Sequence, residues 1–333
     1  MKRFLAFCLT VVLTAIVFPS AGFVSAGPIV PKDIGADAKW FGHVDCEALR
    51  SMKLIQKLKD KCPIQQQCQA KMEKLAEKLG MNPMEDILGA TLYSTRYDGQ
   101  IGVGLVYVKK LDRKKMASLL TEKHPDHKTS EYGSRTLHMW TIEHHEKKMN
   151  LTGTFAADNL IVIGVDAEQV KLALDVLDGK KPCLTEDAPL LKDIAKNTLF
   201  ASRAIDVPET YSKTARCVVL QNCKAATVIW KEVDGQITGN YEFTTDSEEA
   251  AKNFKAIVDG FKAMVELNHG NIPAIKKIMN GLQYNAKGDS FTATFTASEG
   301  DVEAGIKAMM ENKACPMFKM LHDQQKKCEI INK

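Results

Sequence analysis

The chain repeats one arrangement of apolar and polar positions: an alternating run, an acidic or hydroxyl residue, and then an amphipathic stretch. Apolar residues at three- and four-residue intervals, such as Val170, Leu174 and Leu177, predict a helix with one buried face, and alternation predicts a half-buried strand. Strands are predicted at 39–44, 100–109, 160–165, 238–245 and 290–297, and the helices that follow them at 46–60, 113–122, 167–178, 247–267 and 301–312, with a further helix at about 66–79.

The residues at the junctions support this alternation of strands and helices. Asp45, Asp112, Asp166 and Asp246 each stand where a strand pattern gives way to a helix pattern, and Ser298 stands at the last such junction. An Asp or Ser side chain there can accept a hydrogen bond from a free N–H of the first helical turn. We therefore predict that these residues are helix N-caps, which already gives the carboxylates a structural role.

Tight-turn dipeptides between strands favour antiparallel pairing, and they occur at 98–99, 234–235 and 288–289. Residues 164–180 also align with 244–262, sharing a strand end, an acidic cap and a closing Asp-Gly. The sequence thus predicts an α+β fold made of two related units, each an antiparallel sheet with helices packed on one face. A chance likeness between two generic strand–cap–helix segments is the alternative to duplication.

The predicted organisation has six parts. They are a signal peptide at 1–26, a linker at 27–35, a first α+β unit at 36–180, a linker at 181–197, a second α+β unit at 198–313, and a disulfide-pinned C-terminal tail at 314–333. The second linker is placed where Lys-Lys-Pro-Cys and Ala-Pro interrupt the pattern. About 307 residues would remain after removal of the signal, which suits one large or two ordinary domains.

The N-terminus is typical of a cleavable secretory signal peptide. Lys2 and Arg3 precede an apolar run from Phe4 to Phe18, and Val24-Ser25-Ala26 provides a cleavage site before Gly27. The run is shorter than the ~20 residues that span a bilayer, which argues against a membrane anchor. We expect a secreted or periplasmic protein, cleaved near Ala26, with no integral membrane segment in the mature chain.

Charge excludes one class of partner. The full chain has 45 basic and 41 acidic residues, and loss of Lys2 and Arg3 leaves 43 against 41, a net charge of +2. The Lys-Lys pairs are scattered among acidic residues. This balance gives no electrostatic case for nucleic acid.

Eight of the nine cysteines remain after cleavage, because Cys8 leaves with the signal. An even number in an exported protein favours disulfides, and no C-x-x-C occurs to support a zinc or redox site. Eight cysteines allow 105 connectivities. The nearest-neighbour arrangement pairs Cys62 with Cys68, Cys217 with Cys223, Cys315 with Cys328, and Cys46 with Cys183.

Three segments carry a resemblance to a family: ADAKWFGHVDCEALRSMKLIQKL after the signal, YGSRTLHMWT in the middle, and NLIVIGVDAEQVKLALDVLDGK. They resemble uncharacterised exported proteins of planctomycete-type bacteria over most of residues 36–260. The resemblance implies a bacterial extracytoplasmic location. It carries over no activity and no catalytic residues.

A search for catalytic chemistry finds little. No G-x-S-x-G elbow, Walker loop or H-E-x-x-H motif occurs, and Gly102 and Gly104 lie inside an alternating strand. Alternate residues of neighbouring strands could gather His43, His138 and His145 around a metal, although exposed or hydrogen-bonded core histidines are the simpler explanation. Met309, Met310, Met317 and Met320 near Cys315, His322 and Cys328 would suit copper, but core packing explains a methionine stripe better.

Three functions from different classes remain. The favoured one is an exported, non-enzymatic binding or structural protein of unknown ligand, with no cofactor. The second is a carrier of lipid or another apolar ligand, which an apolar pocket would support. The third is a hydrolase or metalloenzyme with an unfamiliar site, which needs His, Asp or Glu side chains that converge in a cleft. The sequence does not identify a partner; a protein or an apolar small molecule would suit these functions.

Overall fold

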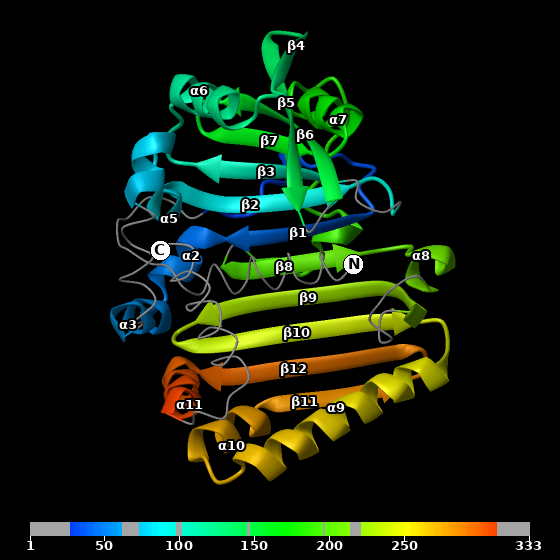
Figure 1. The fold of residues 1–333 in the computed structure, drawn as a ribbon. Helices are drawn as coiled ribbons and strands as arrows, with labels where there is room; N and C mark the ends of the chain where they lie inside the picture. Colours follow the sequence, from blue (N-terminus) through cyan, green and yellow to red (C-terminus); the bar gives the residue numbers. More distant parts are fainter. Residues whose placement is uncertain are drawn as a thin grey trace.

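The computed structural model describes residues 27–61, 73–97, 102–144, 147–195, 197–213 and 221–311. Its strands form one twelve-stranded sheet in the order β11-β12-β10-β9-β8-β1-β2-β3-β7-β6-β5-β4, with every neighbouring pair antiparallel (Figure 1). The strands are β1 (Trp40–Asp45), β2 (Ile87–Ser94), β3 (Val103–Val108), β4 (Lys128–Tyr132), β5 (Arg135–His144), β6 (Lys147–Ala157), β7 (Leu160–Gly164), β8 (Thr198–Ala204), β9 (Cys223–Val233), β10 (Gln236–Thr245), β11 (Leu282–Lys287) and β12 (Ser290–Ser298).

The helices follow the strands much as the sequence pattern predicts. They are η1 (Pro31–Asp33), α2 (Cys46–Ser51), α3 (Lys53–Lys61), α5 (Pro83–Asp86), α6 (Arg113–Lys123), α7 (Ala167–Leu177), η2 (Pro189–Leu191), α8 (Glu209–Lys213), α9 (Glu248–His269), α10 (Pro273–Asn280) and α11 (Glu299–Glu311). The stretch expected as one helix at 46–60 is divided at Met52, which has an extended backbone between α2 and α3. The fold class is α+β, which confirms the prediction.

Most of the predicted N-caps are confirmed. The carboxylates of Asp45, Asp112 and Asp166 accept hydrogen bonds from the backbone N–H groups at the starts of α2, α6 and α7, at 2.8, 3.0 and 2.9 Å. Helix α9 differs, because its cap is Ser247, whose hydroxyl accepts from the N–H of Ala250 at 3.2 Å. The side chain of Asp246 instead accepts a hydrogen bond from that hydroxyl at 3.0 Å.

The two halves of the chain build the two halves of the sheet in the same order. From the centre outward the first half runs β1-β2-β3-β7-β6 and the second runs β8-β9-β10-β12-β11, and the hairpin β4–β5 extends the first half only. Strands β1 and β8 pair antiparallel where the halves meet, with Phe41 opposite Arg203. In chain order, α7 follows β7 as α11 follows β12, and α6 follows β3 as α9 follows β10. The aligned segments 164–180 and 244–262 are therefore not equivalent in the repeat.

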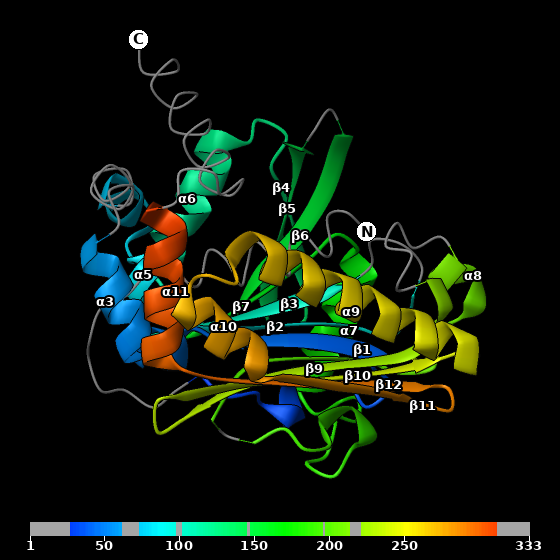
Figure 2. The same ribbon diagram turned by 90° about the horizontal axis from the view of Figure 1, so that it is seen from below.

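Helices cover both faces of the sheet, whereas the sequence predicts one. Val103 and Leu105 on β3 pack in the cluster that contains α7, and Val106 and Val108 on the same strand pack with α6. Because alternate residues of a strand point to opposite faces, α7 and α6 lie on opposite sides. We call these the α7 face and the α9 face; the second also carries α2, α3, α6 and α11 (Figure 2).

The two segments predicted as linkers are instead packed against the α7 face. Ile34 is completely buried, and Leu184, Leu190 and Leu191 are also buried in the same cluster as α7. We call residues 27–38 and 181–195 the two straps; they pair with each other at Gly35 and Cys183. Proline and lysine made these segments resemble linkers, but their few apolar side chains complete the largest core.

Candidate functional site

An apolar area in the middle of the α9 face is the first candidate site. Leu92 on β2, Phe200 on β8 and Val228 on β9 are only partly buried, and none of them contributes to the four buried clusters of the described residues. Trp40 on β1 lies beside them and donates its ring N–H to the carbonyl of Arg96 at 3.0 Å. We call Trp40, Leu92, Phe200 and Val228 the central patch.

Small residues leave the floor of the central patch open. Across the sheet, Val228 lies opposite Ser202, Ser202 opposite Gly42, and Gly42 opposite Leu92. A Cβ placed on Gly42 would meet no described atom closer than the Ser202 hydroxyl, 3.9 Å away. Neighbouring strands are about 4.8 Å apart, so Leu92 and Val228 stand about 14 Å from each other with only small residues between them.

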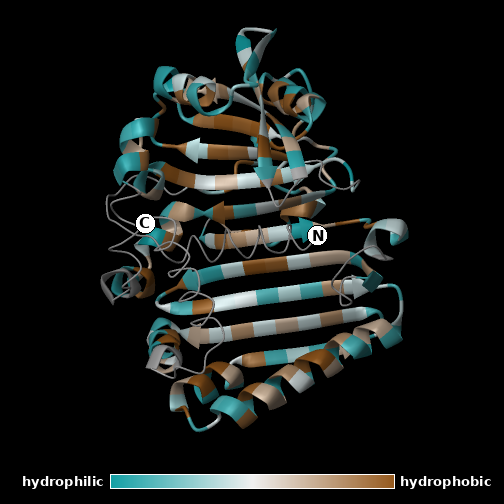
Figure 3. Ribbon diagram, in the orientation of Figure 1, coloured by the Kyte–Doolittle hydropathy of each residue, from teal (hydrophilic) through white to brown (hydrophobic). Residues whose placement is uncertain are grey.

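Helix α9 carries a second apolar surface on the same face. Ile257, Phe261 and Met264 are each about half exposed, and Leu267 is 87% exposed. The first three recur at intervals of four and three residues, which places them along one side of the helix. Figure 3 shows apolar residues recurring along α9. A contiguous row of exposed apolar side chains on one helix is typical of an interaction surface. We call these four residues the α9 stripe.

The contacts of α9 orient this stripe. Its inner side packs through Phe254 on Phe243 and Phe291, with ring centroids 5.0 and 5.5 Å apart. One flank lies at the edge strand β11, where Asp259 accepts a hydrogen bond from the Tyr284 hydroxyl. By helical spacing Ile257, Phe261 and Met264 occupy the opposite flank, which is turned toward the inner strands. The α9 stripe thus borders the side of the sheet that carries the central patch.

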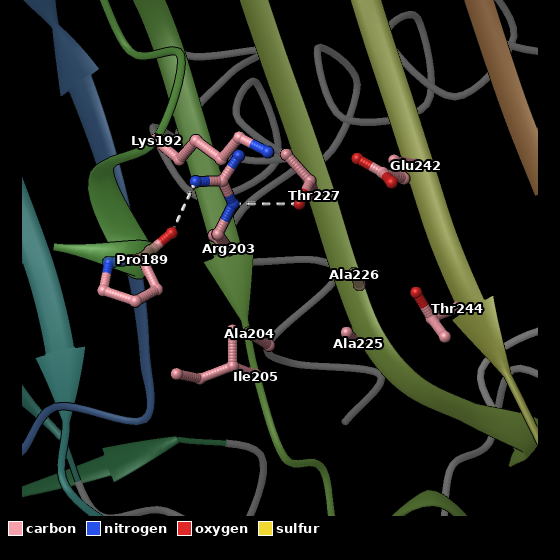
Figure 4. Close-up of a pocket in the computed structure, with 10 residues that line it drawn as sticks. All are labelled: Pro189, Lys192, Arg203, Ala204, Ile205, Ala225, Ala226, Thr227, Glu242 and Thr244. Carbon is pink, nitrogen blue, oxygen red and sulfur yellow. Dashed lines mark hydrogen bonds between the residues drawn. The ribbon is translucent and has the colours of Figure 1, made fainter. Parts of the chain in front are cut away.

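A polar hollow of about 180 Å³ lies on the α7 face, at the end of the strap 181–195 (Figure 4). Arg203, Glu242, Thr227 and Thr244 line it together with Lys192. The Arg203 guanidinium donates to the carbonyls of Pro189 and Leu190 at 2.8 and 3.2 Å and to the Thr227 hydroxyl at 3.0 Å. These bonds hold the strap on the sheet, so we assign Arg203 a structural role.

Replacing Arg203 with methionine is expected to loosen the strap 181–195. The change keeps most of the side-chain volume but leaves the part-buried carbonyl of Pro189 and the buried carbonyl of Leu190 without their donor, at a cost of about 2 kcal/mol in unfolding free energy. Urea unfolding and limited proteolysis of the strap would measure it. Arg113→Met is the control, because Arg113 forms only an exposed pair with Asp158. Equal stability of the two variants would contradict the structural role.

The structure separates the proposed metal ligands. His43 lies on β1 and His138 on β5, with β2, β3, β7 and β6 between them in the sheet. His43 shares the α7 face with Phe41, and His138 lies 5.4 Å from the Phe155 ring on the other face. The prediction assumed neighbouring strands, which is wrong for these two residues, and His145 lies outside the described residues. No three His, Cys, Asp or Glu side chains of the described part of the chain are arranged to hold a metal ion.

A different histidine pair was missed by sequence reasoning. His127 Nε2 lies 3.0 Å from His138 Nδ1, and His127 Nδ1 lies 3.0 Å from the Thr121 hydroxyl. Burial, followed by the neighbouring His127, lowers the pKa of His138. The motif His124-Pro-Asp-His127, immediately before two strands, was the available signal. Two imidazoles joined by one hydrogen bond stabilise the turn between α6 and β4.

Cys46 and Cys183 are free thiols. Cys46 follows β1, and Cys183 pairs with Gly35, which precedes that strand, so the two lie toward opposite ends of β1. The nearest-neighbour bridge from Cys46 to Cys183 is therefore not formed. Burial raises the pKa of Cys46 to about 11, and Cys223 is buried beside α9. The other bridges involve Cys62, Cys68, Cys217, Cys315 and Cys328, which lie outside the described residues.

Two further predictions also concern undescribed residues. The signal peptide at 1–26 and the tail at 314–333, with Met317, Met320 and His322, lie outside the described ranges. No helix in the described part of the chain is long and apolar enough to cross a membrane.

The chain is thus an α+β protein with one continuous antiparallel sheet that spans both halves. No protein-family model matches it, and no curated protein matches it in sequence. Crystal structures of TP0453, a Treponema protein, are similar at low level. The structure of crystal form III has a TM-score of 0.42 and 9% sequence identity, and the match covers 85% of this chain and 99% of the TP0453 chain. The structure of crystal form I has the same TM-score, identity and coverage of this chain, and the match covers 98% of the TP0453 chain.

Proposed function

We propose that this protein is an exported, non-enzymatic carrier whose ligand is a long apolar molecule such as an acyl chain. The central patch carries the proposal. It is an apolar floor at the middle of the sheet, where no described side chain fills the space at Gly42, and it faces the same side as the α9 stripe. The central patch would form the floor of the binding site and the α9 stripe its wall, so that a long apolar molecule is contacted on two sides. Neither the central patch nor the α9 stripe contains a charged side chain.

The alternatives lack a comparable surface. A metalloenzyme of the predicted type would need His43 and His138 together, and they lie on opposite faces of the sheet. The polar hollow on the other face contains an arginine that donates to two carbonyls of the strap and to the Thr227 hydroxyl. Export, cleavage near Ala26 and a planctomycete-type bacterial origin rest on the sequence and form part of the proposal.

The test is titration of the chain that begins at Gly27 with parinaric acid, a fluorescent fatty acid. We expect saturable binding, and loss of about tenfold or more in affinity for Gly42→Leu and for Phe261→Asp. Leucine at position 42 would fill the open floor, while aspartate at 261 would place a charge in the wall. Removal of one apolar contact of this size corresponds to about 1.5–3 kcal/mol.

Val233→Asp is the matched control, since Val233 is 49% exposed at the end of the β9–β10 hairpin and away from the patch. Its affinity should equal that of the wild type. Absence of binding by the wild type, or equal binding by all variants, would contradict the carrier function. In that case a protein partner on the α9 stripe becomes the better hypothesis.

A further inference from the structure

Three buried polar atoms that lack hydrogen-bond partners lie within five residues at the junction of β1 and α2. They are Nε2 of His43, Oδ2 of Asp45 and Oε2 of Glu47. Asp45 is completely buried, and its other oxygen is used to cap α2. An unpaired carboxylate oxygen in the interior is costly, and two lie together here. The two carboxylate oxygens can only accept hydrogen bonds, so a positively charged donor would satisfy them best.

The backbone of Gly27 lies against this group. Gly27 is buried, and its amide N–H faces the Asp45 carboxylate. A Cβ on Gly27 would come within 3 Å of the backbone at Leu88 and Gly89, and a Cβ on Gly89 would come as close to the Gly27 carbonyl. Two glycines therefore allow the first strap to enter the core here, on the α7 face beside β1 and β2.

Gly27 is also the residue that follows the expected cleavage site. Hydrolysis adds one water across the amide bond between Ala26 and Gly27, which leaves a carboxylate on Ala26 and an ammonium group on Gly27. We infer that this new α-ammonium group is buried and pairs with the Asp45 carboxylate, so that removal of the signal completes the core. The inference rests on the export and cleavage that form part of the proposed function.

The pair explains several features together. An α-amino group has a reference pKa of about 7.7–8.0, so it is protonated in neutral solution and supplies three donors. These donors can satisfy Asp45 Oδ2 without any movement of the Gly27 nitrogen from its place in the uncleaved chain. Burial raises the pKa of Asp45 even with the backbone N–H groups of Ala48, Gly27 and Glu47 around its carboxylate, and an adjacent ammonium would oppose that effect. The uncleaved chain keeps a buried carboxylate with an incomplete set of donors.

The experiment compares two chains that differ only at the N-terminus. One begins at Gly27, released by a protease that leaves no extra residue, and the other carries Ala-Ala before Gly27. We expect the Gly27 chain to melt about 5 °C or more higher, because the extended chain lacks the buried charge pair. In the Asp45→Asn background the two chains should melt at the same temperature, since asparagine keeps the helix cap but not the charge.

Asp112→Asn is the matched control, because Asp112 caps α6 in the same way and lies on another element. In that background the difference between the two chains should persist. If Asp45→Asn fails to fold, amine labelling of the wild-type Gly27 chain still tests whether the α-amino group is buried. We expect its α-amino group to react at least tenfold more slowly in the folded than in the unfolded protein, and equal rates would overturn the inference.

Mass spectrometry of the exported protein tests the cleavage site separately. A first residue other than Gly27 would overturn the cleavage site on which the inference rests. The parinaric acid titration does not depend on this result, so the carrier function and the N-terminal pair can fail independently.

Discussion

Replacing Gly281 with alanine is expected to destabilise the protein by about 3 kcal/mol or more in unfolding free energy. Gly281 joins α10 to β11, and its carbonyl accepts a hydrogen bond from the Thr296 N–H at 3.0 Å. A Cβ there would overlap the Thr296 carbonyl oxygen, which belongs to the backbone of β12 and cannot rotate away. The hairpin β11–β12 would have to shift, with Leu282 no longer opposite Phe295.

Gly260→Ala provides the opposite result in the same half of the chain. Gly260 lies inside α9, and a Cβ there meets no described atom within 4 Å. Alanine is favoured over glycine in a helix by about 1 kcal/mol, so this variant should be more stable than the wild type. Urea unfolding of both variants, with hydrogen exchange of β11, measures the difference. A Gly281→Ala protein as stable as the wild type would disprove the close approach.

Acid is expected to remove about 3 kcal/mol of stability through His43 alone. Burial lowers the pKa of His43 to about 4 from an ordinary 6.5, and its ring is hydrogen bonded to Thr91 at 2.8 Å. Between these two values the unfolded chain binds a proton that the folded chain does not. Stability therefore falls as the pH decreases from about 6.5 to 4, and the gap between the two pKa values sets the size of the loss.

His43→Gln isolates this contribution, because glutamine is neutral and can keep a hydrogen bond to Thr91. Urea unfolding at pH 7 and pH 4 should show a smaller acid loss in this variant than in the wild type. The pKa of Asp45 is raised by burial, which acts in the opposite direction near pH 4 in both proteins and cancels in the comparison. His124→Gln, at the end of α6, should retain the full acid loss. Equal pH dependence of the wild type and His43→Gln would reject the assignment.

Local sequence patterns predicted the elements of the fold well, because each depends on neighbours in the chain. The alternation at 160–165 and the cap Asp166 define β7 and the start of α7, and the structure places both there. The turn at Asp234-Gly235 has positive φ at both residues, as the hairpin between β9 and β10 requires.

Properties that depend on distant pairing could not be predicted from the same patterns. The separation of His43 from His138 follows from the order of the strands in the sheet. The face on which α7 packs is set by contacts with residues that are distant in the sequence. The central patch was also missed. Its residues look like ordinary strand residues, and only the register that brings Gly42 between Ser202 and Leu92 leaves them partly exposed.

The pairing of β1 with β8 has a consequence for folding. Phe41 and Arg203 face each other across 162 positions of sequence, whereas most other neighbours in the sheet belong to the same half of the chain. Contacts across such long separations are slow to form, so each half can assemble its own strands first. Until the halves join, β1 and β8 are open sheet edges with largely buried side chains, which favours pairing with other chains. Separate expression of either half is therefore a route to aggregation, despite the repeated topology.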